Sequence, residues 1–344
     1  MSDISSRKDD HIRINLEQDV KSSLSTGFDR IGFKHTALPE FDFQDLSVDC
    51  VFFGKPLRAP ILISYMTGGT SKGDEINQNL ASAAQKVGIA MGVGSQRNQV
   101  GSGLGSQKND LRNLAPDILL FANLGAVQLN YGFGLDECQK AIDILEADGL
   151  ILHLNPLQEV LQPEGQTNFK GLLNKIEHIC QQINQPVIVK EVGWGISAEV
   201  AIKLVNCGVA AIDVAGAGGT SWSEVEKFRN TDESLYRIAS RFNDWGIPTA
   251  KAIQDVHQAL PDTPVIASGG LRSGLDLAKS IALGASLGGY AGRLLKAATL
   301  SVEEVVKLLE EIILEMKVAM FATGVSNLID LKKVVLVGRN DDDF

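Results

Sequence analysis

The sequence predicts a closed barrel of eight parallel strands, each followed by a helix. Eight short apolar runs recur after residue 60, and amphipathic stretches separate them. The runs are continuously apolar, as expected for parallel strands that are covered on both faces. An open doubly wound sheet would normally carry a GxGxxG turn after its first strand, and MTGGTSKG does not match that pattern. Eight strand–helix units in sequence therefore favour a (β/α)8 TIM barrel.

The expected elements follow from these patterns. The strands are expected at 61–66, 89–94, 118–125, 150–155, 187–193, 211–216, 265–270 and 287–292. Helical spacing of apolar residues predicts helices over 74–88, 135–149, 169–183, 197–208, 273–284 and 301–320. Residues 1–60 are expected to form an N-terminal extension to a barrel at 61–344, within a single domain. The polar stretch 217–244 predicts a long loop after the sixth strand, of the kind that often serves as a lid.

Composition excludes several classes of partner. The net charge of −10 argues against nucleic acid and against an anionic membrane surface. It does not exclude a small anionic substrate, because salt screens distant surface charges while local cations act at short range. The start of the chain is polar and contains acids, unlike a signal peptide, and no apolar run approaches the length of a membrane span. Cys50, Cys138, Cys180 and Cys207 form no CxxC, so we expect free thiols in a cytoplasmic protein.

Polar residues and glycines close the apolar runs, at the end where a barrel carries its active site. Each one has an ordinary interpretation, and Asn123 alone would more often be a turn residue. Their convergence at equivalent positions is what indicates a site. The rim consists of Met66, Thr67, Ser95, Arg97, Asn123, His153, Asn155, Lys190, Thr220, Gly269 to Arg272, Ala291 and Gly292.

Two rim segments indicate an anion and a cofactor. SGGLRSG after the seventh run and YAGR after the eighth match the place where barrels often bind phosphate on backbone N–H groups. Arg272 would add a charge-assisted contact, although a plain glycine-rich turn is the alternative. Lys190 ends the fifth run. It could act as a Schiff-base lysine or as a cation beside an electron-rich cofactor. Pairing with Glu191 is the weaker interpretation, because neighbouring strand residues point to opposite faces.

Two further segments suggest recognition of a diphosphate. In LHLNPLQEVLQPEG, His153 and Asn155 lie on one side of the strand, and Gln158 and Glu159 follow in the loop. Glu159 is a candidate Mg²⁺ ligand or, equally, a solvated loop residue. In RKDDH, the residues Arg7, Lys8 and His11 form either a solvated surface or an arm that closes over a diphosphate, which Arg97 would approach from the rim.

Common catalytic motifs are missing from the sequence. It contains no GxSxG elbow, no HExxH and no Walker loop, and no second acid is obviously paired with Glu159. This thin set of acid–base groups suggests that a cofactor carries the chemistry.

Taken together, the motifs resemble those of the type 2 isopentenyl diphosphate isomerases over nearly the whole chain. RKDDH, MTGG, GSQR, HLNPLQE, QPEG, VKEVGWGIS, DVAGAGGTSW and SGGLRSG occur in the order found in that family. The resemblance implies an FMN-dependent barrel that interconverts isopentenyl and dimethylallyl diphosphate without net redox change. It further implies reduced FMN as the acid–base group, NADPH as reductant, Mg²⁺, and a homo-oligomer, commonly a tetramer or larger.

The resemblance also assigns expected roles to individual residues. The flavin would contact Tyr65, Met66, Thr67, Ser95, Asn123, Lys190 and Thr220, and its phosphate Gly269, Gly270, Arg272, Ala291 and Gly292. The substrate would contact Arg7, Lys8, His11, Ser95, Gln96, Arg97, His153, Asn155 and Gln158, and Glu159 would hold Mg²⁺. The candidate catalytic residues are Gln158, His153 and Lys190, with Gln158 near the allylic carbons.

The sequence departs from the family pattern at two places. Gln166 and Thr167 follow QPEG where an acidic and then a basic residue are common, and Ala215 stands where many members carry Ser. Two other functions stay open. An FMN-dependent 2-hydroxy-acid oxidase would need an Arg and a His near the sixth or seventh strand end, whereas His257 falls inside a predicted helix. A non-catalytic flavin redox sensor would not need the diphosphate cluster.

Overall fold

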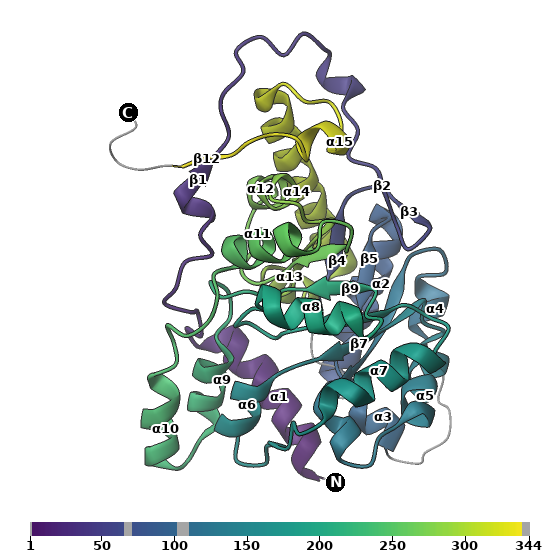
Figure 1. The fold of residues 1–344 in the computed structure, drawn as a ribbon, viewed down its shortest axis with the longest axis vertical. Helices are drawn as coiled ribbons and strands as arrows, with labels where there is room; N and C mark the ends of the chain where they lie inside the picture. Colours follow the sequence, from purple (N-terminus) through teal and green to yellow (C-terminus); the bar gives the residue numbers. More distant parts are fainter. Residues whose placement is uncertain (1, 65–70, 102–109, 339–344) are drawn as a thin grey trace.

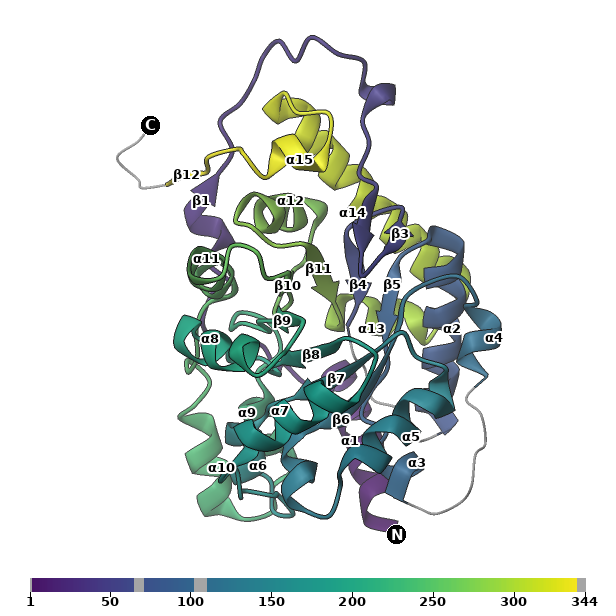
Figure 2. The ribbon, with the colours of Figure 1, turned by 45° about the vertical axis from the view of Figure 1, so that its right-hand side comes forward.

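The computed structural model describes residues 2–64, 71–101 and 110–338, and it contains the predicted barrel. Eight parallel strands close into a ring, in which each strand pairs with the next one along the chain and the last pairs with the first (Figures 1 and 2). All eight predicted strands are confirmed, each shorter than predicted. They are β4 (Ile61–Ile63), β5 (Ala90–Gly92), β6 (Leu120–Gly125), β7 (Gly149–His153), β8 (Val187–Lys190), β9 (Ala211–Asp213), β10 (Val265–Ala267) and β11 (Leu287–Tyr290).

Helices surround this ring, and the predicted ones are confirmed, including the helix that contains His257. Ser197, Ser273 and Ser301 each accept a backbone N–H three residues ahead, which explains why α8, α12 and α14 begin there. The main helices are α2 (Ser71–Val87), α5 (Leu135–Leu145), α7 (Leu172–Gln182), α8 (Ala198–Asn206), α11 (Thr249–Ala259), α12 (Gly274–Ala282), α13 (Gly292–Ala298) and α14 (Val302–Thr323). Shorter helices are α3 (Arg97–Gly101), α4 (Leu111–Leu114) and α15 (Leu328–Leu331), and 3-10 turns span Phe28–Arg30, Phe43–Asp45 and Ala126–Asn130.

The N-terminal extension reaches both ends of the barrel. Its helix α1 (Ser2–Glu17) packs beside α2, α13 and a further helix, α9 (Trp222–Arg229), at the end where the strands finish. The chain then pairs β1 (Ile31–Gly32) with β12 (Val337–Gly338) and runs on past α15 (Figure 1). It finally forms the hairpin β2 (Cys50–Phe52) and β3 (Lys55–Leu57), which closes the opposite end.

Two segments that we predicted as loops contain helices. The 217–244 connection carries α9 (Trp222–Arg229) and α10 (Glu233–Ser240), and Gln158 and Glu159 lie on α6 (Pro156–Leu161). In α9, Val225 is buried against Ile14 and Val20 of the extension. The stretch appeared loop-like in sequence because its apolar partner lies some 200 residues earlier in the chain. The start of α6 is explained by Pro156, whose fixed backbone angle suits the first position of a helix.

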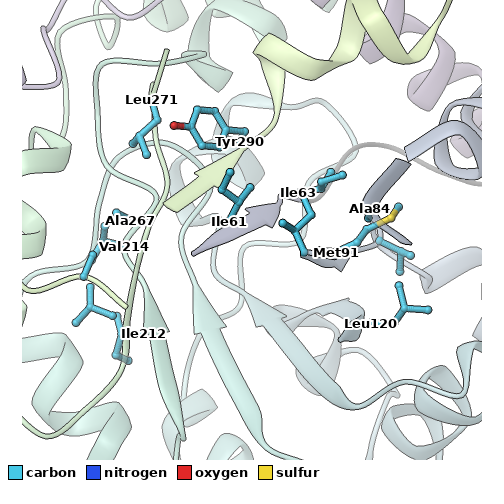
Figure 3. Close-up of a cluster of buried hydrophobic side chains, with 14 of the residues drawn as sticks. Ile61, Ile63, Ala84, Met91, Leu120, Ile212, Val214, Ala267, Leu271 and Tyr290 are labelled. Carbon is cyan, nitrogen blue, oxygen red and sulfur yellow. The ribbon is translucent and has the colours of Figure 1, made fainter. Parts of the chain in front are cut away.

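The apolar core forms two layers around the strands. Figure 3 shows part of the outer layer, in which Ile61, Ile63, Met91 and Ile212 face the helices. The inner layer fills the barrel itself and consists of Phe52, Leu57, Leu62, Ala90, Leu119, Phe121, Ile151, Ile188, Ala211, Ile266 and Leu287. Alternate strand residues therefore face opposite sides, as the two-residue period of a strand requires. No helix in the described ranges is long and apolar enough to cross a membrane.

Candidate active site

A polar layer lies directly above the inner apolar layer of the barrel. The strand residue two positions beyond each apolar one faces the same side, because side chains alternate along a strand. Applying this step to all eight strands gives Ser64, Gly92, Asn123, His153, Lys190, Asp213, Ser268 and Gly289, all of them buried except the half-buried His153. Sequence reasoning identified Asn123, His153 and Lys190, but it missed Ser64, Asp213 and Ser268. The same two-residue step from the apolar runs would have found them.

A cavity of about 650 Å³ opens above this layer, within the range of small-molecule sites. It is lined by residues from α1, from the strand ends and from the loops that follow them. The structure thus brings together most of the predicted site, namely Arg7, Lys8, His11, Ser95, Arg97, Asn123, His153, Asn155, Gln158, Glu159, Lys190, Thr220, Gly269, Gly270, Arg272, Ala291 and Gly292. The predicted flavin residues Tyr65, Met66 and Thr67 lie outside the described residues.

Gln96 is the predicted substrate residue that the structure turns away from the cavity. Its side chain is buried and donates from Nε2 to the Ala141 carbonyl at 3.0 Å. Its Oε1 accepts the Asn123 backbone N–H at 3.0 Å. Both ends of the amide are therefore engaged within the protein, and Gln96 supports the position of Asn123.

His153 is held neutral in one tautomer. The Asn123 Nδ2 donates to the Val93 carbonyl at 3.0 Å, so Asn123 Oδ1 faces His153 Nδ1 at 2.8 Å and accepts its proton. The ring therefore carries its proton on Nδ1 and a lone pair on Nε2. Burial, together with the charges of Lys190 and Arg7, lowers the His153 pKa to about 3.

Lys190 and Glu191 send their side chains in different directions, as the strand pattern predicted. Lys190 Nζ reaches the cavity and donates to the Glu191 carbonyl. The Glu191 carboxylate instead accepts the N–H groups of Val192, Gly193 and Trp194 at 2.6 to 2.7 Å. Burial raises the Glu191 pKa to about 7, although these hydrogen bonds and the charge of Lys190 lower it in part. Glu191 thereby fixes the turn in which Val192 and Gly193 line the cavity.

Helix α6 contributes a connected group of amides and a carboxylate. Asn155 Nδ2 donates to Gln158 Oε1 at 3.2 Å and to Glu159 Oε1 at 2.9 Å. Glu159 Oε2 accepts from Gln162 at 2.7 Å and from the Gln166 backbone N–H at 2.5 Å. Gln158 Nε2 in turn donates to Glu226 Oε1 at 2.9 Å, so the orientation of the Gln158 amide is fixed at both ends.

Glu226 on α9 is a site residue that sequence reasoning missed. It is fully buried, lies 3.1 Å from His11 Nε2, and forms a 2.6 Å ion pair with Arg229. Arg229 also pairs with Glu164 at 2.7 Å, and Glu164 lies 3.9 Å from Arg7. Burial would raise the Glu226 pKa, but His11, Arg229 and Gln158 together lower it. The three-residue spacing of Glu226 and Arg229 was the available signal, had the segment been assigned as a helix.

Three cations gather at the mouth of the cavity. Lys8 Nζ donates to the Ser95 carbonyl at 3.1 Å, and burial together with the charge of Arg7 lowers the Lys8 pKa to about 8. Burial and Arg7 also lower the pKa of Arg97, although Glu159 opposes the change. Like charges that disfavour one another in this way would be stabilised by an anion between them.

The loops after β9 and β10 touch backbone to backbone at one side of the cavity. Gly269 and Gly270 have φ of +105° and +80°, which favour glycine. A Cβ added to Gly269 would lie 2.1 Å from the Gly216 carbonyl oxygen, and one added to Gly270 would lie 2.6 Å from Gly218. Glycine is therefore required where the two loops meet, and Gly269 and Gly270 line the cavity beside Arg272 and the additional cation Arg293.

Comparison with known proteins first defines the class. Residues 156–337 match the FMN-dependent dehydrogenase family. A lactate oxidase of Pediococcus acidilactici shares the fold with a TM-score of 0.68 and 19% identity, over 96% of this chain and 87% of that one. A flavocytochrome b2 variant gives a TM-score of 0.70 and 16% identity, over 95% and 82%. At these identities the likeness concerns the fold alone.

Full-length relatives define the family within that class. Proteins named isopentenyl-diphosphate delta-isomerase are 53% identical in Nostoc sp., over 95% of this chain and 94% of the relative, and 51% identical in Synechocystis sp., over 97% and 96%. Another, from Oceanobacillus iheyensis, is 48% identical over 98% of both chains. The chain therefore belongs to the isopentenyl-diphosphate delta-isomerase family, which confirms the resemblance found in the motifs.

Proposed function

We propose that this protein interconverts isopentenyl and dimethylallyl diphosphate with FMN as cofactor. The cluster of Arg7, Lys8 and Arg97 at the mouth of a cavity with a polar floor is the observation that carries the proposal. A diphosphate would relieve the repulsion among these cations, which a hydroxy-acid substrate with one carboxylate would do less well. The oxidase alternative also lacks its catalytic His, because none occurs in residues 211–222 or 265–275, at the ends of the sixth and seventh strands, and His257 lies in α11.

The residues of the cavity fit FMN. Ser64, which lines the cavity, has a buried Oγ with no hydrogen-bond partner in the described part of the chain. Gly269, Gly270, Arg272, Ala291 and Gly292 would hold the phosphate of the cofactor, with Arg293 beside them. The flavin would lie against Ser95, Asn123, Lys190 and Thr220. When bound and reduced by NADPH, FMN would supply the acid–base group that the chain itself lacks.

Glu159 fits a role as Mg²⁺ ligand. Its two oxygens already accept three hydrogen bonds, but a carboxylate has about four lone-pair sites, so it retains capacity for a cation. No cluster of three His, Cys, Asp or Glu side chains that could hold a metal occurs among the described residues. Mg²⁺ would therefore depend on the substrate diphosphate and water for its other ligands, as it commonly does.

The remaining side chains would bind and orient the substrate. Arg7, Lys8, His11 and Arg97 line the cavity from α1 and the rim, where they would approach the diphosphate and α1 would limit the access of water. His153 is neutral, so it offers the Nε2 lone pair as an acceptor and has no extra proton to donate. Gln158, whose amide is fixed by Asn155 and Glu226, would orient the carbons that gain and lose a proton.

The test of this proposal is isomerisation in D₂O. The purified protein is reduced anaerobically with NADPH and Mg²⁺, and isopentenyl diphosphate is then added. Deuterium-labelled dimethylallyl diphosphate that forms only with reduced FMN would support the proposal. A yellow protein that forms no isomer would return the function to an oxidase or a redox sensor, and a colourless protein that gains no activity with added FMN would remove the cofactor assignment.

The proposal includes a homo-oligomer, tetrameric or larger, in the cytoplasm. Leu314 and Val318 lie one turn apart on α14 and are each 53% exposed, so this helix offers an apolar face to a second copy. The four cysteines are free, as is usual for proteins of reducing compartments. Light scattering after gel filtration measures the mass directly, and a monomer would remove the assembly from the proposal.

A further inference from the structure

Asp213 is a fully buried carboxyl in the polar layer that the proposed reaction leaves without a role. It ends β9 and pairs in register with Lys190 at the end of β8. On its other side lies Ser268, which follows β10. Lys190 and Ser268 both line the cavity, so Asp213 lies between two cavity residues without lining the cavity itself.

The contacts of Asp213 determine the direction of the Ser268 hydroxyl. Ser268 Oγ donates its one proton to Asp213 Oδ1 at 2.5 Å, which leaves Ser268 with lone pairs alone for the cavity. The same Oδ1 accepts the Ala215 backbone N–H at 3.3 Å. Asp213 Oδ2 has no hydrogen-bond partner within the described ranges.

Charge gives Asp213 a second effect on the cavity floor. With His153 neutral, Lys190 and Asp213 are the two other ionisable side chains of the eight-residue polar layer. Burial raises the Asp213 pKa above its ordinary value, and the charge of Lys190 and the bonds from Ser268 and Ala215 counter that rise only in part. An ionised carboxylate here would offset the Lys190 charge at short range, where the interior screens charges weakly.

We propose that Asp213 is a positioning residue, which fixes Ser268 as a hydrogen-bond acceptor toward the cofactor and offsets the charge of Lys190 at the cavity floor. The inference deepens the proposed function and rests on FMN occupying this cavity. A purely structural role is the competing explanation. Ala215 has φ of +38°, an unfavourable value for a residue with a Cβ, and the bond from its N–H to Asp213 stabilises that turn.

Asp213→Asn separates the positioning role from the purely structural role, because it keeps the shape of the side chain and removes its negative charge. We expect the dissociation constant of FMN, from fluorescence titration of the apoprotein, to rise about tenfold. We also expect the flavin midpoint potential to become more positive, since reduction adds electrons and a nearby negative charge has been removed. The matched control is Ser280→Ala, which removes a fully buried hydroxyl on α12 that bonds to the Asp276 carbonyl, away from the cavity. The control should change neither quantity.

A lower melting temperature of apo Asp213→Asn, with FMN affinity and potential both unchanged, would overturn the inference in favour of the structural role. If the Asn variant does not fold, Ser268→Ala decides: weaker FMN binding supports the inference, and unchanged binding overturns it. These measurements need no turnover. A wild-type protein that binds FMN but does not isomerise the diphosphate would therefore reject the proposed function and leave the Asp213 comparison intact.

Discussion

The two ends of the barrel are built from the same eight strands, yet they differ in how their polar groups are satisfied. At the closed end, Phe52 and Leu57 of the hairpin pack onto the inner apolar layer, and Asp148 pairs with Lys55 at 2.6 Å and with Arg112 at 2.8 Å. At the open end, Ser64 and Asp213 carry unpartnered buried atoms within the described part of the chain, and cations crowd together. The difference indicates that one end contributes stability and the other is prepared for a ligand, the usual division in this fold.

The largest effect should come from the closed end. Phe52 is 4% exposed, and Phe52→Ala would leave a cavity against the inner layer, which costs about 3–5 kcal/mol of unfolding free energy. We expect chemical denaturation to show this loss while kcat of the folded protein stays unchanged. Val51→Ala, at an exposed position of the same strand, is the control and should cost less than about 0.5 kcal/mol. A large fall in kcat for Phe52→Ala would show that the two ends are not separable.

The next effect concerns the open end. Glu159→Gln removes the carboxylate that would hold Mg²⁺, so we expect Mg²⁺-dependent turnover to fall roughly a hundredfold or more. FMN content, measured from the visible spectrum, should not change. Glu303→Gln alters an exposed carboxylate on α14 and serves as the control. Unaltered turnover in Glu159→Gln would remove this residue from the mechanism.

A smaller effect, which depends on pH, would sharpen the comparison between the two ends of the barrel. A buried cation such as Lys8 that serves ligand binding should lower the free energy of unfolding. The Lys8 pKa is lowered from its usual 10.5 to about 8 by burial and by Arg7, so kcat/KM should fall about fivefold between pH 8 and 9 as the proton is lost. Over pH 8 to 10.5 the unfolded chain binds the proton more tightly, so the Lys8 contribution makes unfolding free energy rise with pH.

Lys8→Met is the control for this pH effect. It should remove both slopes, and the difference from wild type isolates Lys8 from the other groups that titrate in this range. The two measurements are the pH profile of kcat/KM and denaturant titration at each pH. If kcat/KM and unfolding free energy fell together in wild type above pH 8, the assignment of Lys8 as a binding cation would be wrong.

The smallest effect should come from the ion pair at the closed end. Lys55 and Asp148 side chains are 37% and 22% exposed, so Lys55→Met should cost less than about 1 kcal/mol. Turnover should be unchanged. A larger loss of unfolding free energy, measured by denaturant titration, would mean that this pair, rather than apolar packing, holds the hairpin in place.

The sequence predicted the barrel well because its signals are local. Continuous apolar runs and three-to-four spacing show which faces of each strand or helix are buried. This pattern is the same whichever element packs against those faces. The rim residues also followed, since the strand ends of a closed barrel meet at one edge. The direction of the Gln96 side chain could not be predicted. The sequence places Gln96 near the rim, but it does not show that its amide N–H would donate to the Ala141 carbonyl.

The sequence alone determined the fold class, the family and most of the residues around the cavity, because these follow from the order and period of side chains along the chain. Tertiary structure alone decided that 217–244 is helical, since Val225 is buried by Ile14 and Val20 from the other end of the sequence. It also decided the protonation of His153 and buried the carboxyl groups of Glu226 and Asp213 beside residues of the cavity. Burial and charge act over a few ångströms between residues that lie far apart in the chain, so their effects appear only when the barrel has closed.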